Sequence, residues 1–516
     1  MPRTSTEAKT RHIAIIGGGT AGWMAAAMLS HAVGPEQCQV TIVDDESGGL
    51  GVGEATIPSI LRLVRMLGGN EAGFMQACDA TWKLGIQFSD WKSGKDIWHP
   101  FGVCGAQVDG RDLFPFWLAQ LSRSEKRLRP YHGHSLHWSA ALAGKAPHGR
   151  SRLSPIAATG SYAYHVNADG LAGWLRQHAM QAGCQHVSQR VLDADRADDG
   201  LVQYVRLTDG SVLSADFFID CSGFESILQD HPGSAWQSWG DELLCDAAVV
   251  LRLPPASIVP VHTKATALSA GWCWDIPLVT RRGLGYVFST QFQSAEDATN
   301  ELLQFAGLKQ DTIATAEPRV LSLQTGRRTN FWVGNVLSLG LAAGFAEPLE
   351  SSGLHLTQVG IERFLQLFPA EANDHVLQTA YNEAMAVAFE EVRDFIALHY
   401  HLNDRTAETD PTGFWTAARE ASLSDALRHR LKLYDEVGEL PLLSPDAFGE
   451  TSYFHLLAGS GRLPSRPPAA ALGADREQVE QILTAIIEQN RAALRDLPMH
   501  EESLRHVHPT AFSKAS

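Results

Sequence analysis

The sequence lacks the features of a secreted or membrane-spanning protein. It has no apolar run of about 18 residues, and its polar N-terminus, MPRTSTEAKTRH, has no apolar core like that of a signal peptide. Its seven cysteines include no CxxC pair and are odd in number, which favours neither a disulfide framework nor a zinc site. We therefore expect a soluble, cytoplasmic protein with reduced thiols, no metal site and no membrane contact.

Positive charge is also scarce. Forty-two Lys and Arg residues oppose 58 Asp and Glu residues, which gives a formal net charge of −16. Such a chain has little attraction for nucleic acid or anionic lipid, so a small-molecule partner is favoured and no nucleic acid is expected. Hydrophobic residues make up 44% of the 516 residues, which is typical of a folded protein of two or three domains.

A nucleotide-binding motif lies near the N-terminus. In HIAIIGGGTAGWMAAAMLSHA a β-branched run precedes a glycine cluster and an Ala-rich stretch, which predicts strand, turn and helix. In the GxGxxG pattern, Gly17 permits a tight turn, Gly19 lets a pyrophosphate approach the backbone, and Gly22 lets the helix pack closely. Thr20 and Ala21 complete the motif, and the helix N-terminus can bind phosphate.

A second predicted strand, QVTIVDD, ends at Asp44, 27 residues after Gly17. An acidic side chain at this place can accept a hydrogen bond from a ribose hydroxyl, which indicates an adenine dinucleotide. The alternative is an acidic residue of a surface turn, because Asp45 and Glu46 follow directly.

Two later segments favour FAD over NAD. SADFFIDCSGFES, with Gly223, and NVLSLGLAAGFAEPLESSGLHL, with Gly340, are each typical of an apolar strand that runs into a glycine turn. Flavoproteins of this fold draw their flavin site from separated pieces, whereas an NAD domain is usually contiguous. Since no second GxGxxG follows a strand, we expect no NAD(P)H domain within the chain.

The patterns predict a mixed α/β (α+β) chain in two parts. Residues 1–370 form a discontinuous, Rossmann-like FAD-binding module of the flavin-monooxygenase type. A Gly-, His- and Trp-rich region at about 85–160 is expected to form loops and short strands that line a substrate pocket. Residues 371–516 carry apolar residues at intervals of three and four, which predicts a mainly helical subdomain that covers the substrate.

The stretch GWCWDIP places Trp272 and Trp274 two residues apart. In a strand both indoles would point to the same face and form a wall. The spacing alone is also typical of a core strand that carries aromatic bulk.

Six short motifs occur in an order typical of a known family. They are GGGTAGW, GVGEATIP, TWKLGI, DCSGF, WCWDIP and EPLESSG. Over residues 11–505 the chain resembles the flavin-dependent halogenases of the tryptophan-halogenase superfamily. The most specific motif is WxWxIP, formed here by Trp272, Trp274, Ile276 and Pro277, which we call the tryptophan wall.

The resemblance implies an enzyme that brominates or chlorinates an electron-rich aromatic substrate such as indole or an indole derivative. Reduced FAD, supplied by a separate NAD(P)H-dependent flavin reductase, would react with O2 to a C4a-hydroperoxide, which a halide ion converts to hypohalous acid. The tryptophan wall would keep the organic substrate away from the flavin.

The resemblance also assigns site residues. Lys83, from TWKLGI, would hydrogen-bond the hypohalous acid or become a haloamine, and Glu350, from EPLESSG, would accept a proton or hydrogen bond from the arenium intermediate. Ser352 and Gly353 match a Thr-Gly pair whose backbone N–H groups bind halide.

His99 and Phe101, from HPFG, match residues that line the aromatic pocket of the family. We expect their flat faces to sandwich the substrate ring. A packed turn is the alternative for His-Pro-Phe-Gly.

The chain departs from free-tryptophan halogenases between Tyr434 and Gly459. Those enzymes use a Tyr pair and a Glu for the amino-acid group, followed by an aromatic pair and an Asn. Here the Tyr pair and the Asn cannot be placed, only Phe448 matches the aromatic pair, and Tyr453 and Phe454 are not assigned to the substrate. A zwitterionic tryptophan therefore lacks its expected anchors. A free-tryptophan halogenase, an aromatic flavin monooxygenase and a non-catalytic flavin-binding protein stay as alternatives, and the native substrate, regiochemistry, halide and oligomeric state, a homodimer included, stay open.

Overall fold

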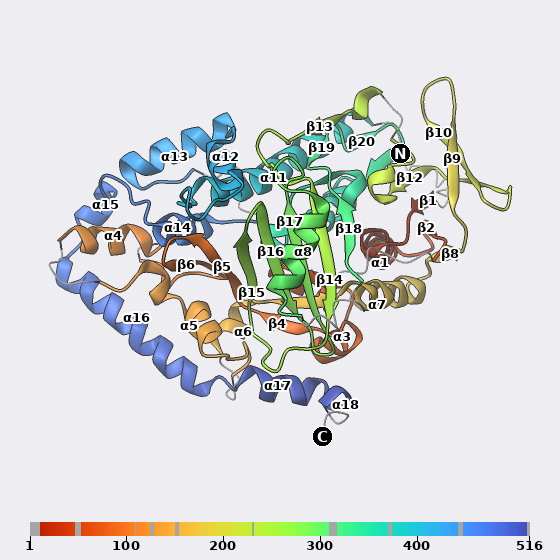
Figure 1. Cartoon of the computed structure of the whole chain (residues 1–516). Helices are drawn as coiled ribbons and strands as arrows, with labels where there is room; N and C mark the ends of the chain where they lie inside the picture. Colours follow the sequence, from red (N-terminus) through yellow and green to blue (C-terminus); the bar gives the residue numbers. More distant parts are fainter. Residues whose placement is uncertain are drawn as a thin grey trace, which may run out of the picture.

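The computed structural model has a mixed α/β fold, which confirms the predicted fold class (Figure 1). The structure describes residues 11–46, 53–108, 110–123, 128–149, 154–229, 232–308, 317–369, 374–441 and 447–512. Residues 1–10 of the polar N-terminus, the first two residues of GVGEATIP and residues 442–446 of the stretch from Tyr434 to Gly459 lie outside the described residues.

A six-stranded sheet forms the nucleotide-binding layer. Its strands, in spatial order, are β20 (Trp332–Val333), β21 (Val336–Ser338), β12 (Phe217–Asp220), β1 (Arg11–Ile16), β2 (Cys38–Val43) and β8 (Gln185–Val187). All neighbours from β21 to β8 pair in parallel. Because parallel strands end at the same edge, the turns after β1, β2, β12 and β21 meet there.

Helices cover this sheet. The predicted strand, turn and helix are β1, the glycine turn and α1 (Thr20–Val33), and α1 packs against α7 (Ala168–Gln181) and α10 (Gly353–Gln366). The helices α2 (Ile60–Met66) and α3 (Glu71–Ala77) come after β1 and β2 in sequence, and α3 contacts α7.

A seven-stranded sheet carries the tryptophan wall. Its order is β18 (Arg319–Ser322), β14 (Ala247–Leu253), β17 (Arg282–Phe288), β16 (Gly271–Pro277), β15 (Thr263–Leu268), β5 (Gly85–Lys92) and β6 (Lys95–Pro100). GWCWDIP is β16, as predicted. Trp272 and Trp274 join the large core on one face, whereas Cys273 faces the core beneath α8 (Ala295–Phe305), which crosses the sheet in Figure 1.

Three small sheets complete the strands. They are β3 (Gly53–Ala55), β7 (Ala163–Asn167) and β4 (Thr81–Lys83); β11 (Val212–Ser214), β10 (Val202–Leu207) and β9 (Val191–Arg196); and β13 (Trp236–Ser238), β19 (Gly326–Arg328) and β22 (Gly344–Phe345). The sheet of β3, β7 and β4 places Lys83 at the end of β4. Just before β4, the carbonyl of Ala80 lies 2.9 Å from Nε2 of His508, near the C-terminus.

Residues 85–160 are more regular than expected. β5 and β6 belong to the seven-stranded sheet, and α4 (Phe114–Arg123), α5 (Leu136–Leu142) and α6 (Pro155–Thr159) follow. The prediction of loops and short strands is therefore wrong for much of this region. The aromatic residues of FPFWLAQLSR are buried against other rings, and this tertiary packing holds a helix where local composition suggested loops.

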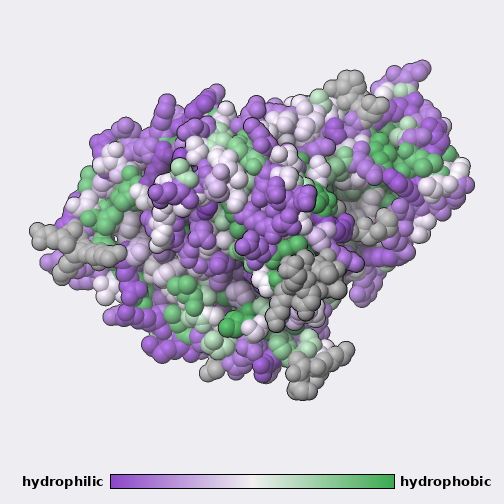
Figure 2. Space-filling model, in the orientation of Figure 1, coloured by the Kyte–Doolittle hydropathy of each residue, from purple (hydrophilic) through white to green (hydrophobic). Residues whose placement is uncertain are grey.

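The helical pattern predicted for the C-terminal part is confirmed. The helices are α11 (His375–His401), α12 (Phe414–Glu420), α13 (Asp425–Val437), α14 (Glu450–Ser460), α15 (Ala469–Leu472), α16 (Arg476–Asp496), α17 (His500–Val507) and α18 (Pro509–Phe512). Figure 1 shows α16 along one edge of the molecule, where it packs on α4 and α5. Among the described residues, none of the helices has the length and apolarity needed to cross a bilayer. The face in Figure 2 is mostly hydrophilic.

The indole of Trp274 packs directly onto Gly285. This contact predicts that a Cβ atom added at Gly285 lowers the stability of the protein. Gly285 of β17 pairs with Trp274, and a Cβ atom at this glycine would lie 1.9 Å from Cζ2 of the indole. We expect Gly285→Ala to displace the ring and lower the free energy of unfolding by about 1–3 kcal/mol, as overpacked cores do. Urea denaturation measures this change.

Gly173→Ala is the matched control. This glycine lies in α7, and a Cβ atom there has no described atom within 4 Å. The added methyl group should leave stability unchanged or raise it slightly. Equal losses in both variants would contradict the packing of Trp274 on Gly285.

Candidate functional site

A cavity of about 930 Å³ lies at the carboxyl edge of the six-stranded sheet. This volume is typical of sites for cofactors and other small molecules. The predicted residues that line it are Gly17, Gly19, Thr20, Ala21, Asp44, Gly223, Gly340, Trp272, Trp274, Ile276, Ser352 and Gly353. The other predicted site residues, all described by the structure, lie outside this lining: Gly22, Pro277, Lys83, Glu350, His99 and Phe101.

The glycine turn has the geometry that the motif predicts. Gly17 has φ +104°, and a Cβ atom there would lie 2.5 Å from the carbonyl oxygen of Cys221. A Cβ atom at Gly22 would lie 1.9 Å from the carbonyl oxygen of Gly17. At Gly19 the same atom would have no described atom within 4 Å, so a ligand can approach the backbone.

The residues at this end of the cavity fit an adenine dinucleotide. The first turn of α1, TAGW, carries no carboxylate among its described residues, so the positive end of the helix dipole is available to phosphate. Asp44 follows β2, and a Cβ atom at Gly18 would lie 2.0 Å from its Cγ. Gly18 therefore lets the Asp44 carboxylate lie against the glycine turn, where a ribose hydroxyl can reach it.

Two further turns close the cavity. The short helices η2 (Gly223–Glu225) and η4 (Gly340–Ala342) follow β12 and β21. A Cβ atom at Gly340 would lie 2.7 Å from Cβ of Ala21, so η4 packs directly on α1. The Asp220 carboxylate accepts hydrogen bonds from the N–H groups of Ser222 and Leu228, at 3.0 and 2.9 Å, and fixes the turn after β12.

The tryptophan wall is held by hydrogen bonds. The indole centroids of Trp272 and Trp274 lie 6.1 Å apart at 57°. Nε1 of Trp272 donates to Oε2 of Glu347 at 3.1 Å, and the hydroxyl of Tyr400 donates to the same oxygen. Burial raises the pKa of Glu347 to about 7. Pro277 accepts a hydrogen bond from Oγ1 of Thr81 at 2.7 Å, which ties the wall to β4.

Lys83 is fully buried beside this cavity. Its Nζ donates to Oγ of Ser351 at 2.8 Å and to the carbonyl of Thr56 at 3.1 Å. Nζ also lies 5.3 Å from the centroid of the Phe101 ring. Burial lowers the pKa of Lys83 to about 7, against the attraction of Glu350, which raises it. Since Ser351 lines the cavity, it connects the cavity with the lysine.

Glu350 ends the short helix η5 (Pro348–Glu350) and is also fully buried. Nδ1 of His99 lies 2.8 Å from its Oε2, and Nε2 of His399 lies 2.8 Å from its Oε1. Burial would raise the pKa of this carboxyl group, but the two histidines outweigh burial and lower the pKa of Glu350 to about 2. Lys83, Glu350 and His99 therefore lie in one buried cluster.

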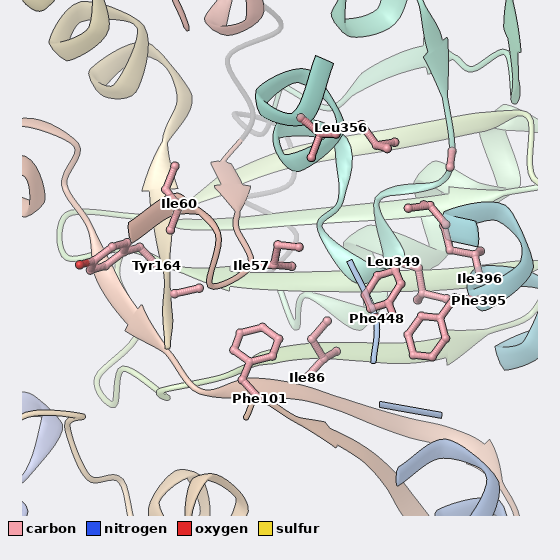
Figure 3. Packing of buried hydrophobic residues seen from close by; sticks show 14 of the residues in the cluster. Ile57, Ile60, Ile86, Phe101, Tyr164, Leu349, Leu356, Phe395, Ile396 and Phe448 are labelled. Carbon is pink, nitrogen blue, oxygen red and sulfur yellow. The ribbon is translucent and has the colours of Figure 1, made fainter. Parts of the chain in front are cut away.

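The aromatic neighbours of the cluster correct one expectation. The rings of His99 and Phe101 are perpendicular, at 88°, with centroids 5.9 Å apart. A sandwich needs parallel faces about 7 Å apart, twice the ordinary contact distance, so these residues form adjoining walls instead. The ring of Phe448 stacks on that of Phe395 with centroids 4.0 Å apart, and Figure 3 shows this pair near Leu349, with Phe101 set apart from it.

The aromatic residues between Tyr434 and Gly459 are engaged within the protein. The hydroxyl of Tyr434 donates to the carbonyl of Arg462 at 2.9 Å, and Nη1 of Arg430 donates to the hydroxyl of Tyr453 at 2.8 Å. Phe454 stacks on Phe114 at 4.2 Å. This packing agrees with leaving Tyr453 and Phe454 out of the substrate site.

Four residues of the site escaped the sequence analysis: Glu347, Ser351, His399 and Tyr400. The first two belong to the quoted motif EPLESSG, so the motif itself could have directed attention to them. His399 and Tyr400 lie in the sequence FIALHYH at the end of α11, which only indicates a buried helix.

Comparisons with known proteins agree with the arrangement. Residues 12–475 match the family model described as "Tryptophan halogenase". The tryptophan 6-halogenase SttH of Streptomyces toxytricini is 33% identical over 95% of this chain and 97% of its own. The tryptophan 7-halogenase RebH of Lentzea aerocolonigenes is 30% identical over 97% and 99%.

Solved structures of flavin-dependent halogenases are also similar to this chain. Xcc4156, a flavin-dependent halogenase from Xanthomonas campestris, is 34% identical with a TM-score of 0.88, covering 97% of this chain and 98% of its own. BrvH, a flavin-dependent halogenase from Brevundimonas sp. BAL3, is 33% identical with a TM-score of 0.87, covering 98% and 100%.

Burial of Lys83 predicts how stability changes with pH. Its pKa falls from 10.5 to about 7 on folding, so between these values the unfolded chain binds more protons than the folded one. The Lys83 contribution to the free energy of unfolding then rises with pH, by up to about 1.4 kcal/mol per unit. We expect Lys83→Met to remove this rise between about pH 7 and 9, as measured by urea denaturation at several pH values.

Lys432→Met is the control, because this lysine is exposed on α13. It should keep the wild-type slope. If Lys83→Met also kept that slope, Lys83 would not titrate in this range.

Proposed function

This chain belongs to the tryptophan halogenase family of flavin-dependent enzymes, and from that premise we propose that it brominates or chlorinates indole, an indole derivative or a similarly electron-rich aromatic compound. The observation that carries the proposal is the buried amine of Lys83, held by Ser351 at the cavity and placed beside Glu350.

The cavity residues would hold FAD. The glycine turn and the N-terminus of α1 suit its pyrophosphate, Asp44 suits a ribose, and the turns at Gly223 and Gly340 complete the site. When bound in reduced form, delivered by a separate NAD(P)H-dependent reductase, FAD would supply hypohalous acid from O2 and halide.

The halide would bind at the N-terminus of α10. Ser352 precedes this helix and Gly353 begins it, and both line the cavity. The first turn, GLHL, carries no carboxylate among its described residues, so the positive end of the helix dipole favours an anion there. This supports a backbone halide site that does not need the threonine hydroxyl of the family motif.

The tryptophan wall would separate this cavity from the aromatic substrate. Trp272 and Trp274 present two large rings to the cavity, and Glu347 holds the first of them in place. A monooxygenase needs its substrate next to the flavin, so a fixed barrier of this kind favours halogenation over oxygenation. Ile276 continues the barrier, and Pro277 anchors it to the strand of Lys83.

Lys83 would transfer the halogen. As an amine it can attack hypohalous acid, forming an N–halogen bond while the halogen–oxygen bond breaks and the hydroxide leaves as water with a proton from the amine. As an ammonium it can instead donate a hydrogen bond to the acid and polarise it. In either route the ring carbon takes the halogen, and Glu350 accepts the ring proton as aromaticity returns.

The substrate would lie against Phe101, His99 and Phe448. Indole or a substituted indole is favoured over free tryptophan, because the tyrosine hydroxyls at 434 and 453 are already bonded within the protein. This packing supports a substrate without a zwitterionic amino-acid group.

The proposal is tested by identifying the reaction product. Purified protein would receive FAD, a flavin reductase, NADH, O2 and bromide or chloride, with indole, tryptophan and a panel of phenols, and isotope-resolved mass spectrometry would identify products. We expect Lys83→Ala to abolish halogenation while keeping FAD binding, and Glu350→Gln to slow halogenation by about 10²–10⁴-fold, as loss of a proton-transfer group does.

Lys432→Ala, remote on α13, should leave the product pattern unchanged. Oxygenated product from the wild-type protein would refute the proposal in favour of a monooxygenase. Halogenation by Lys83→Ala at the wild-type rate would refute the role of the lysine.

Variants of the adjacent residues Ser351 and Ser352 distinguish the role of a side-chain hydroxyl from that of a backbone binding site. Ser351→Ala removes an oxygen that binds Nζ of Lys83 and leaves this buried donor one partner short, so we expect halogenation to slow by about 10–100-fold, the usual cost of an unsatisfied buried donor. Ser352→Ala keeps the backbone and should stay within about twofold of the wild type.

Ser351 has φ +59°, a conformation that glycine adopts without strain. Ser351→Gly therefore separates the lost hydroxyl from backbone strain. It should be as slow as Ser351→Ala, and a normal rate in the glycine variant would show that the hydroxyl is not needed.

A further inference from the structure

His399 lies between two hydrogen-bond acceptors. Its Nδ1 is 2.7 Å from the carbonyl oxygen of Phe395, and its Nε2 is 2.8 Å from Oε1 of Glu350. A neutral imidazole has a single N–H, so it can donate to only one of these oxygens. The remaining contact needs one more proton, either on the imidazole ring or on the carboxyl group.

Both placements of this proton give the pair the same net charge. An imidazolium with a carboxylate sums to zero, and so does a neutral imidazole with a carboxylic acid. The arrangement with a neutral His399 and an anionic Glu350 would bring two lone pairs together at one of the two short contacts, and both side chains are buried away from bulk solvent.

The contact of His99 with Glu350 requires no additional proton. His99 reaches Glu350 through Nδ1 alone, at 2.8 Å from Oε2, and its neutral form satisfies this contact with one N–H. The geometry therefore assigns the additional proton to the pair of Glu350 and His399.

The net charge of the Glu350–His399 pair determines how strongly a protonated Lys83 side chain is stabilised. Among the described residues, the titratable groups that act on Lys83 are Glu350 and His165. Burial lowers the pKa of His165 well below its ordinary value, so this histidine is neutral. If His399 balances Glu350, no net negative charge is left to stabilise a buried ammonium.

We propose that His399 is a positioning residue that holds a proton against Glu350, so that the pair is electrically neutral and Lys83 keeps its amine form. The inference rests on the proposed function only for the meaning of that amine as the halogen acceptor. The charge arrangement itself can be tested without flavin, halide or substrate.

The helix α11 is suited to this role. Two consecutive residues, His399 and Tyr400, contact the two glutamates of EPLESSG: the histidine meets Glu350 and the tyrosine donates to Glu347. A single turn of α11 thus fixes the carboxylate of the lysine cluster and the carboxylate behind the tryptophan wall.

The experiment titrates Lys83 directly. Protein labelled with ¹³C at the lysine ε-carbon, free of cofactor, would be titrated by NMR, and Lys83 would be assigned by the signal that Lys83→Met loses. We expect a wild-type midpoint at or below about 7.

His399→Gln keeps a donor for Glu350 but cannot hold the extra positive charge. The unbalanced carboxylate should then raise the Lys83 midpoint by about one pH unit or more, and the double variant His399→Gln with Glu350→Gln should restore it. In assays of halogenation, the low-pH limb of the rate profile should move to higher pH in His399→Gln. An unchanged NMR midpoint in His399→Gln would overturn the proposal.

Glu350→Gln provides a second, independent test of whether the Glu350–His399 pair is neutral. If the pair is neutral, removing the carboxylate also removes the reason for the proton on His399, and the Lys83 midpoint should move by less than about half a unit. If Glu350 were an unbalanced anion, the same change should lower the midpoint by about one unit or more, which would overturn the proposal. This arm decides even where His399→Gln fails to fold.

His401→Gln is the matched control on the same helix. Nδ1 of His401 lies 3.2 Å from the carbonyl of Arg419, away from Glu350, so the variant should keep the wild-type midpoint. Because the titration needs no turnover, a failed NMR prediction with intact halogenation rejects only the role of His399. A confirmed titration without halogenation rejects only the proposed function.

Discussion

The burial of Lys83 is the constraint on which the rest of the site depends. Water no longer solvates the side chain, so its nitrogen needs oxygen partners from the protein, and Ser351 and Thr56 supply them. The strand that carries the lysine is fixed in turn by the bond between Thr81 and Pro277. Thr56 and Ser351 come from distant segments of the chain, so the hydrogen bonds of the lysine form only when these segments have packed against β4.

Two glutamates three residues apart show how environment decides chemistry. Glu347 meets neutral donors, an indole N–H and a phenol, and burial raises its pKa to about 7. Glu350 meets two imidazoles, which lower its pKa to about 2. The same motif thus provides a carboxyl group that is readily protonated behind the tryptophan wall and another that stays charged or shares a proton beside Lys83. Sequence position alone does not distinguish them.

The sequence predicts those parts of the site that depend on the spacing of residues within one short segment. Gly17 and Gly22 follow from a short pattern with a steric cause, and the common face of Trp272 and Trp274 follows from the period of a strand. Contacts between distant segments leave no such pattern. His399 reaches Glu350 across 49 residues, and its surroundings in sequence only indicate a buried helix. The helices within 85–160 were missed for a related reason, since packing of their aromatic residues overrides local composition.

The contact of His508 with the carbonyl of Ala80 ties the beginning of the site to the end of the chain. The two residues are 428 positions apart, and the carbonyl lies just before the strand of Lys83. During synthesis on a ribosome, where N-terminal segments emerge and begin to fold first, this strand can gain the contact only after His508 has emerged. The order of synthesis thus withholds this anchor from the strand of Lys83 until long after the strand itself has emerged.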